Sequence, residues 1–131
     1  MANKSFISIF DAAGYGTVEN VKYFVEQQEA DVNARYIGGE TPLHHAAQEN
    51  PDVEVLEYLI SQGANVNAKN VRGETPLHHA AWDNPNVAVL EYLISQGANV
   101  HAKDKEGLRP LDLIVGNKEK KRILREAMDL S

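Results

Sequence analysis

The chain contains no cysteine among its 131 residues. This absence excludes a disulfide framework, a thiolate metal site and a cysteine nucleophile. No apolar run approaches the roughly 18–20 residues that a membrane-spanning helix needs. The opening residues, MANKSFISIF, contain neither the apolar segment nor the cleavage site of a signal peptide. We therefore expect no membrane span and a cytoplasmic location.

Positive charge is also scarce. Thirteen Lys and Arg residues stand against nineteen Asp and Glu residues, a net charge of −6, which disfavours general nucleic-acid binding. The charge is uneven, because residues 1–102 carry five basic and thirteen acidic side chains, whereas residues 103–131 carry eight and six. The basic excess is concentrated in KEKKR at 118–122. This run indicates either a solvated face or a patch for a phosphate, a nucleic acid or another acidic partner.

Motifs for catalysis are missing as well. The chain has no paired acid and base, no nucleophile elbow and no glycine-rich phosphate loop. The segment GYG at 14–16 lacks the spacing of a dinucleotide-binding loop. The sequence therefore predicts neither an enzymatic activity nor a cofactor.

An internal repeat is the strongest feature that is present. The segment GETPLHHAAQENPDVEVLEYLISQGANVNAKNVR at 39–72 recurs as GETPLHHAAWDNPNVAVLEYLISQGANVHAKDKE at 73–106, with 26 of 34 positions identical. Weaker copies lie on both sides, ISIFDAA upstream and GLRPLDLIV downstream. The pattern predicts one domain over residues 1–131, built of four repeats. Their approximate limits are 5–38, 39–72, 73–106 and 107–131, with the outer two as caps.

Each repeat predicts two helices. Thr41 is placed to cap a first helix, with Pro42 at its first position, and this helix should end before Asn50. We expect Asn50 and Pro51 to repeat the same capping pattern and open the second helix. An apolar stripe at helical spacing then marks that second helix, formed by Val53, Leu56, Leu59 and Ile60.

Glycine ends the second helix in the central repeats. Gly63 is placed as a left-handed stop, and the polar residues after it suit an extended, hairpin-like turn. The first repeat has QQEAD where the others have QGAN. We therefore expect a looser or longer helix end at residues 27–29.

With TPLHHAA at 41–47 and 75–81, each followed by VLEYLISQGANV, the chain resembles the ankyrin repeat family over residues 5–128. The resemblance implies an all-α solenoid of stacked helix–turn–helix units with hairpin-like loops. It also implies a non-catalytic module that binds another protein. The usual period of the family is 33, and the central repeats here are one residue longer between their helices.

Four of the five histidines occur as adjacent pairs, His44–His45 and His78–His79. Like positions in stacked helices lie roughly 10 Å apart, and adjacent helix residues point about 100° apart, so neither arrangement predicts a metal site. The resemblance implies that His44 and His78 bond the cap and loop backbone. It places His45 and His79, where the family usually has Leu, partly buried between the first helices.

In ankyrin repeats the hairpin tips and the ends of the first helices line a concave binding face. Several positions that differ between the two central repeats lie in those places. The resemblance therefore implies a set of candidate partner-binding residues, namely Tyr15, Tyr36, Ile37, Glu40, Gln48, Glu49, Val71, Arg72, Glu74, Trp82, Asp83 and Lys105. It also raises hydroxylation of Asn33 or Asn67, a question that the sequence leaves open.

Trp82 is the only tryptophan, and its counterpart Gln48 shows that the fold does not require an aromatic residue there. Its ring either packs over a neighbouring helix end or loop, or anchors a partner together with Tyr36 and Arg72. The acidic residues of the candidate set favour a partner with a basic patch. The alternative is a structural protein whose repeats associate with one another. We expect a monomer with at most weak self-association.

Overall fold

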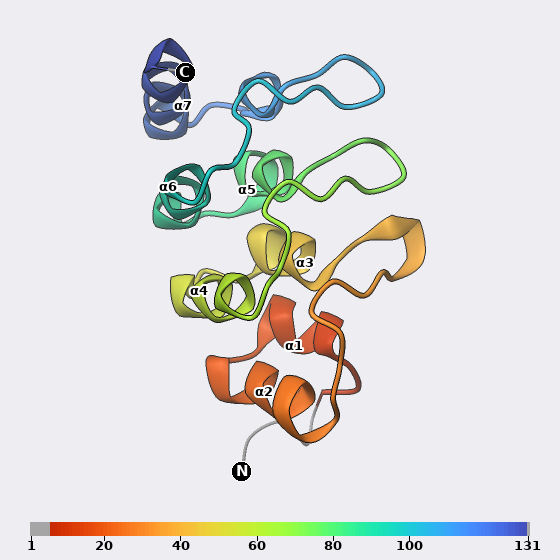
Figure 1. The fold of residues 1–131 in the computed structure, drawn as a ribbon. Helices are drawn as coiled ribbons and strands as arrows, with labels where there is room; N and C mark the ends of the chain where they lie inside the picture. The colour runs from red at the N-terminus through yellow and green to blue at the C-terminus, as the bar shows by residue number, and fades with distance from the viewer. Residues whose placement is uncertain (1–5, 131) are drawn as a thin grey trace.

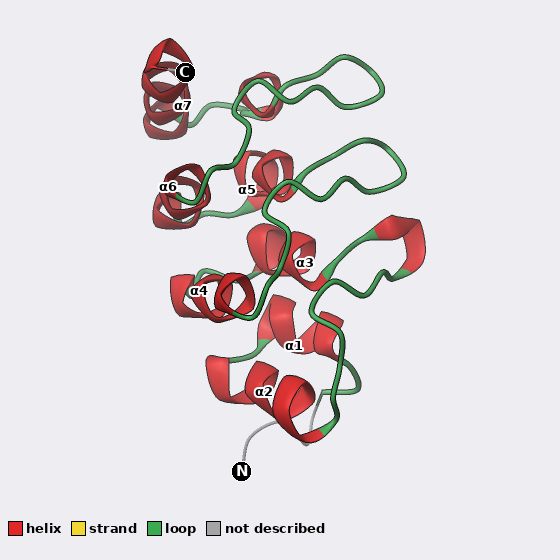
Figure 2. Cartoon of the chain, in the orientation of Figure 1, coloured by secondary structure: helices red, strands yellow, loops and turns green. Residues whose placement is uncertain are grey.

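The computed structural model describes residues 6–130, which form helices and loops and contain no strand (Figure 2). The repeats stack as four layers, from the first repeat at one end to α7 at the other (Figure 1). The first helices form one column and the second helices form another, while the loops project on the far side of the first helices (Figure 1). The predicted all-α solenoid is therefore confirmed. The predicted outer limits at residues 5 and 131 lie outside the described residues.

The helices follow the predicted order. The first helices of the layers are α1 (Ile9–Tyr15), α3 (Pro42–Glu49), α5 (Pro76–Asp83) and a short 3-10 helix, η3 (Pro110–Leu113). The second helices are α2 (Val18–Lys22), α4 (Val53–Ser61), α6 (Val87–Ser95) and α7 (Lys118–Leu130). Two further short segments belong to the first layer: the π-helical turn η1 (Tyr23–Gln27), which continues α2, and the 3-10 turn η2 (Ile37–Gly39).

The core is one apolar stripe that runs through all four layers. Leu43 and Leu77 on the first helices are fully buried, as are Leu56 and Leu90 on the second helices. Alanines on the first helices, such as Ala46, are also fully buried and leave room for the neighbouring layer to approach closely. No single layer encloses this stripe, so each layer depends on its neighbours.

The predicted caps of the first helices are confirmed. The Thr41 hydroxyl accepts a hydrogen bond from the His44 backbone N–H, and the Thr41 N–H donates to Nδ1 of His44. Nε2 of His44 then donates to the Glu74 carbonyl at 2.8 Å, and His78 does the same to the Leu108 carbonyl. Both histidines thus join their helix cap to the loop of the next layer, as the family resemblance implied.

The prediction that Asn50 and Pro51 open the second helix is wrong. Helix α4 begins at Val53 and is capped by the side chain of Asp52, whereas Asn50 is the residue that ends α3. The Asn50 side chain is buried, and its Oδ1 accepts the N–H of Asp52, the residue before the helix, at 3.0 Å.

The Asn50 amide forms a bridge between layers. Its Nδ2 donates to the carbonyls of Ala13 and Gly16, at 2.9 and 2.8 Å, at the end of α1. Asn84 repeats this bridge one layer later, with the carbonyls of Ala47 and Asn50 as acceptors. These carbonyls lie at helix ends, where no partner exists within the helix. The buried asparagines therefore hold consecutive first helices together.

The first layer departs from the others at its second helix. Helix α2 loosens into the π-helical turn, and Glu29 then takes a left-handed conformation with φ 54°. The central layers have Gly63 and Gly97 at this bend, with φ 99° and 92°. Because a side chain is strained in that region, the helix lacks the sharp stop that glycine allows. The expected irregular end at residues 27–29 is confirmed.

Replacing Asn84 with alanine should lower the free energy of unfolding by about 2 kcal/mol, because two buried carbonyls lose their donor. Urea denaturation followed by circular dichroism measures the change. Asn99→Ala is the matched control, since the Asn99 side chain is exposed and accepts the N–H of His101, two residues away. Equal destabilisation by the two changes would contradict the role of the buried amide.

Candidate functional site

A groove of about 740 Å³ runs between the first helices and the loops of the first three layers. Most of the candidate partner-binding residues meet there, although they come from three different repeats. Nine of the twelve line the groove: Tyr15, Tyr36, Ile37, Glu40, Gln48, Glu49, Arg72, Glu74 and Trp82.

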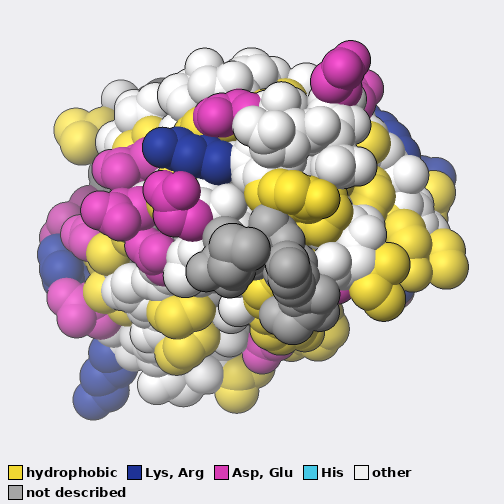
Figure 3. Space-filling view, turned by 90° about the horizontal axis from the view of Figure 1, so that it is seen from below, with side chains coloured by type: hydrophobic (Ala, Val, Ile, Leu, Met, Phe, Trp, Pro, Cys, Tyr) yellow, Lys and Arg dark blue, Asp and Glu magenta, His cyan; other side chains and the backbone are white. Residues whose placement is uncertain are grey.

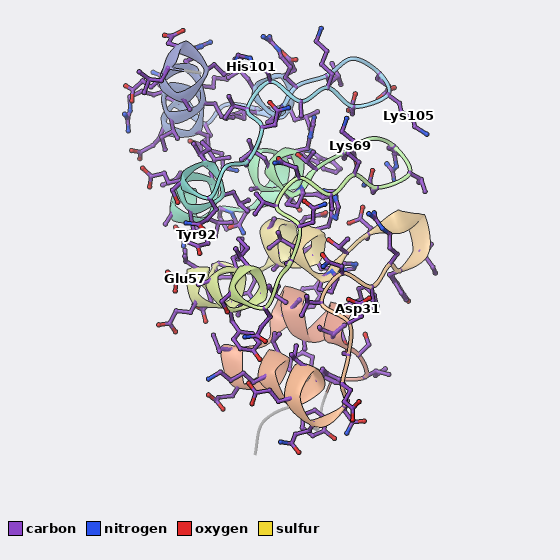
Figure 4. The ribbon with its side chains drawn as sticks, in the orientation of Figure 1. Asp31, Glu57, Lys69, Tyr92, His101 and Lys105 are labelled. Carbon is purple, nitrogen blue, oxygen red and sulfur yellow. The ribbon has the colours of Figure 1, made fainter. Side chains whose placement is uncertain are left out.

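The remaining three candidates, Val71, Asp83 and Lys105, are exposed but do not line the groove. The backbone N–H of Val71 donates to the Gly38 carbonyl, and that of Lys105 donates to the Arg72 carbonyl. These bonds connect neighbouring loops. Figure 4 shows Lys105 at the tip of its loop, on the side away from the helices.

Large apolar side chains are exposed along the groove. Trp82 on α5 is 54% exposed, and Tyr15 and Tyr36 are 68% and 52% exposed. Ile37 lies beside Tyr36 at the tip of the first loop and is also exposed. Large apolar side chains that gather in this way commonly mark interaction sites.

Glu40 and Glu74, two of the acidic candidate residues, belong to a hydrogen-bonded network in the polar part of the groove. The side chains of these two residues are 20% and 13% exposed. Nδ2 of Asn70 donates to Oε2 of Glu40 at 2.6 Å and to Oε1 of Glu74 at 3.0 Å. Nε2 of His79 lies 3.1 Å from Oε2 of Glu40. Burial alone would raise the pKa of Glu40, but the hydrogen bond and charge of His79 and the Asn70 hydrogen bond lower it to about 2.

Sequence analysis missed seven residues that line the groove, namely Ile7, Ser8, Phe10, Asp11, Gly38, His45 and His79. A signal existed for the two histidines, because each precedes a candidate residue by three positions, and this spacing puts both on one helix face. The Phe10 ring lies 5.1 Å from the Tyr36 ring and 5.7 Å from the His45 ring. Burial lowers the pKa of His45, although nearby carboxylates oppose the change.

Acidic charge is not confined to the groove. Glu19, Glu54 and Glu57 surround a shallow hollow between α2 and α4, on the side of the second helices. Figure 3 shows acidic side chains gathered on that same side of the molecule, seen from the end formed by the first layer. The net charge of the chain therefore does not identify the groove.

The basic run KEKKR is only partly a solvated face. Lys120 is 4% exposed, and its Nζ donates to the carbonyls of Ala80 and Ala81 at 3.0 and 3.1 Å. Burial lowers the pKa of Lys120, opposed by the charge of Asp83. Lys120 thus takes the bridging role of Asn50 and Asn84 at the last layer.

The exposed part of the run has less free charge than its sequence indicates. Arg122 forms ion pairs with Glu119 and Glu126, at 3.1 and 3.2 Å, on its own helix α7. Lys120 is buried and Arg122 is paired with glutamates of its own helix. If this run binds an anion, its remaining basic residues are Lys118 and Lys121.

Asn33 and Asn67 also connect layers. Nδ2 of Asn33 donates to the Gly63 carbonyl, and its Oδ1 accepts the N–H of Asn65. Asn67 makes the same pair of contacts with the next layer. Both side chains therefore have a structural role.

A family model for ankyrin repeats, with three copies, matches residues 9–104. The chain belongs to the ankyrin repeat family. Ankyrin repeats are generally modules for protein–protein interaction and are typically non-enzymatic. A comparison with curated proteins found no match. Within residues 6–130, no helix is both long and apolar enough to cross a membrane.

Lys120→Ala should lower the free energy of unfolding by about 1–3 kcal/mol, because buried carbonyls at the end of α5 lose their donor. Lys118→Ala removes an exposed lysine from the same helix and should change stability by less than about 0.5 kcal/mol. Thermal and urea denaturation compare the two. Similar effects would mean that Lys120 belongs to a solvated face after all.

Acid should destabilise the ankyrin domain in part through His44. Burial lowers the pKa of His44 to about 4 from 6.5, opposed by its hydrogen bond to the Glu74 carbonyl. The neutral ring is therefore favoured by folding, so its contribution is complete above pH 6.5 and is lost as pH falls towards 4. The loss amounts to about 3 kcal/mol. Urea midpoints between pH 7 and 4 should fall less steeply in His44→Gln, and parallel curves would contradict this assignment.

Proposed function

We propose that this ankyrin domain binds a partner protein through the groove between its loops and first helices. The observation that carries the proposal is the gathering of Trp82, Tyr36 and Arg72 in one groove from three different repeats. Trp, Tyr and Arg are the residue types that most often dominate the energy of an interface. The proposed function is binding, and it requires no catalytic residue.

The mechanism is the presentation of a preformed surface. The bridges between layers hold the first helices, and hydrogen bonds between the loops hold their tips. A surface that is ordered before binding loses little conformational entropy when a partner arrives. A few anchors can then determine the affinity.

The partner that fits best is an extended segment with an apolar residue beside a basic one. Trp82 and Tyr15 offer apolar contact, while Asp11 and Glu49 contribute negative charge in the same groove. Among residues 6–130, Arg72 is the single Lys or Arg residue that lines it. This excess of carboxylates favours lysine or arginine on the partner.

Trp82→Ala should weaken binding of a groove-directed peptide by about 2 kcal/mol or more, which is about thirtyfold in Kd. The probe is a peptide selected on the immobilised domain from a random displayed library and then measured by calorimetry. Glu57→Ala is the control, because Glu57 lies on α4, on the side away from the loops (Figure 4).

Thermal denaturation first establishes that both variants are folded. Selected peptides that bind Trp82→Ala as tightly as wild type, or that lose affinity with Glu57→Ala, would place the binding surface elsewhere. A failure to enrich lysine or arginine in the selected peptides would contradict the basic partner.

A further inference from the structure

Three side chains in the groove converge from two loops and one helix. Glu40 ends the first loop, Glu74 ends the second loop, and His79 lies on α5. One ligand atom of each lies within 4.8 Å of the other two. We propose that Glu40, Glu74 and His79 form a binding site for a divalent transition-metal ion, for which Zn²⁺ is the suitable probe.

The donor set suits such an ion. One imidazole nitrogen and two carboxylate oxygens are ligands that Zn²⁺ takes in proteins. Nε2 of His79 lies 3.1 Å from Oε2 of Glu40 and 3.9 Å from Oε1 of Glu74. Donors around one tetrahedral ion at about 2.1 Å are separated by about 3.4 Å. Small side-chain movements would therefore bring all three to one ion.

The charges of the cluster also favour a divalent cation. Two carboxylates held this close in a half-buried place repel each other. Asn70 bridges them, but its amide is neutral. Within residues 6–130, the imidazole of His79 is the one basic side chain within 4.0 Å of either carboxylate, and an imidazole carries at most one positive charge. A divalent ion offsets both.

The ring of His79 can turn the lone pair of Nε2 to an ion once the proton that Nε2 donates to Oε2 of Glu40 has moved. Its Nδ1 is buried and has no hydrogen-bond partner within residues 6–130, so the proton of a neutral ring can reside there and leave the lone pair on Nε2. His44 provides the contrast, because its Nδ1 accepts the Thr41 N–H and its Nε2 donates to the Glu74 carbonyl. Binding would thus displace the proton of Nε2 to Nδ1 or to solvent.

In the part of the chain that the structure describes, one junction between layers carries the full donor set. His45 occupies the position of His79 one repeat earlier, but Phe6 stands there in the place of Glu40. Nε2 of His45 has no hydrogen-bond partner among the described residues. One repeat later, Leu108 stands in the place of Glu74 and Leu113 in the place of His79. His45 is therefore a matched control within the same chain.

All three ligands line the groove, so an ion can enter from solvent and keep open positions for water. The test is calorimetric titration of chelator-treated, full-length protein with ZnCl₂, together with the visible absorption of bound Co²⁺. Wild type should bind one ion per chain. Glu74→Gln and His79→Leu should each weaken binding by roughly tenfold or more, whereas His45→Leu should bind as wild type does.

Circular dichroism shows whether each variant remains folded, and Glu74→Gln keeps an acceptor for Asn70 if the loss of His79 proves too disruptive. Absence of Zn²⁺ binding by wild type would overturn the proposal. Binding that survives both changes, that is lost in His45→Leu, or that requires two chains per ion would also overturn it.

Discussion

The carbonyl groups at the end of each first helix find their hydrogen-bond donor in the next layer, and the rest of the structure depends on this constraint. Helix ends leave such groups without internal partners, and burial makes an unpaired carbonyl costly. Asn50, Asn84 and Lys120 supply the donors at successive junctions. Since each layer completes the one before it, the layers are stable as a stack, and the loops and first helices keep the spacing that forms the groove.

Near-identical repeats do not produce identical surfaces. The two central copies each carry the His pair, yet His79 contacts a carboxylate whereas His45 packs beside Phe10. The two histidines differ because each contacts the preceding layer, and the preceding layers differ in sequence. The surfaces of the central repeats therefore differ at the junctions between repeats, where residues shared by both copies meet residues that differ.

Much of the fold could be predicted from short-range rules. Thr41 with Pro42 marks a helix start wherever it occurs, and Gly63 marks a helix end, because both act through the backbone of their own segment. Asn50 was misassigned because its local pattern resembles a cap, while its partners lie 34 and 37 residues away in the sequence. The burial of Lys120 was not predicted for the same reason, since a lysine within a basic run gives no local sign of a buried partner.

The sequence by itself determined the number and order of the layers and most of the helix starts and stops. The period and the local backbone preferences carry that information. The family resemblance added nine of the residues that line the groove. Tertiary structure alone decided that Glu40 and His79, 39 residues apart, lie in hydrogen-bonding distance, and that Lys120 is buried. Such pairs depend on the distance and rotation between stacked layers, which follow from the packing of whole helices and not from any one segment.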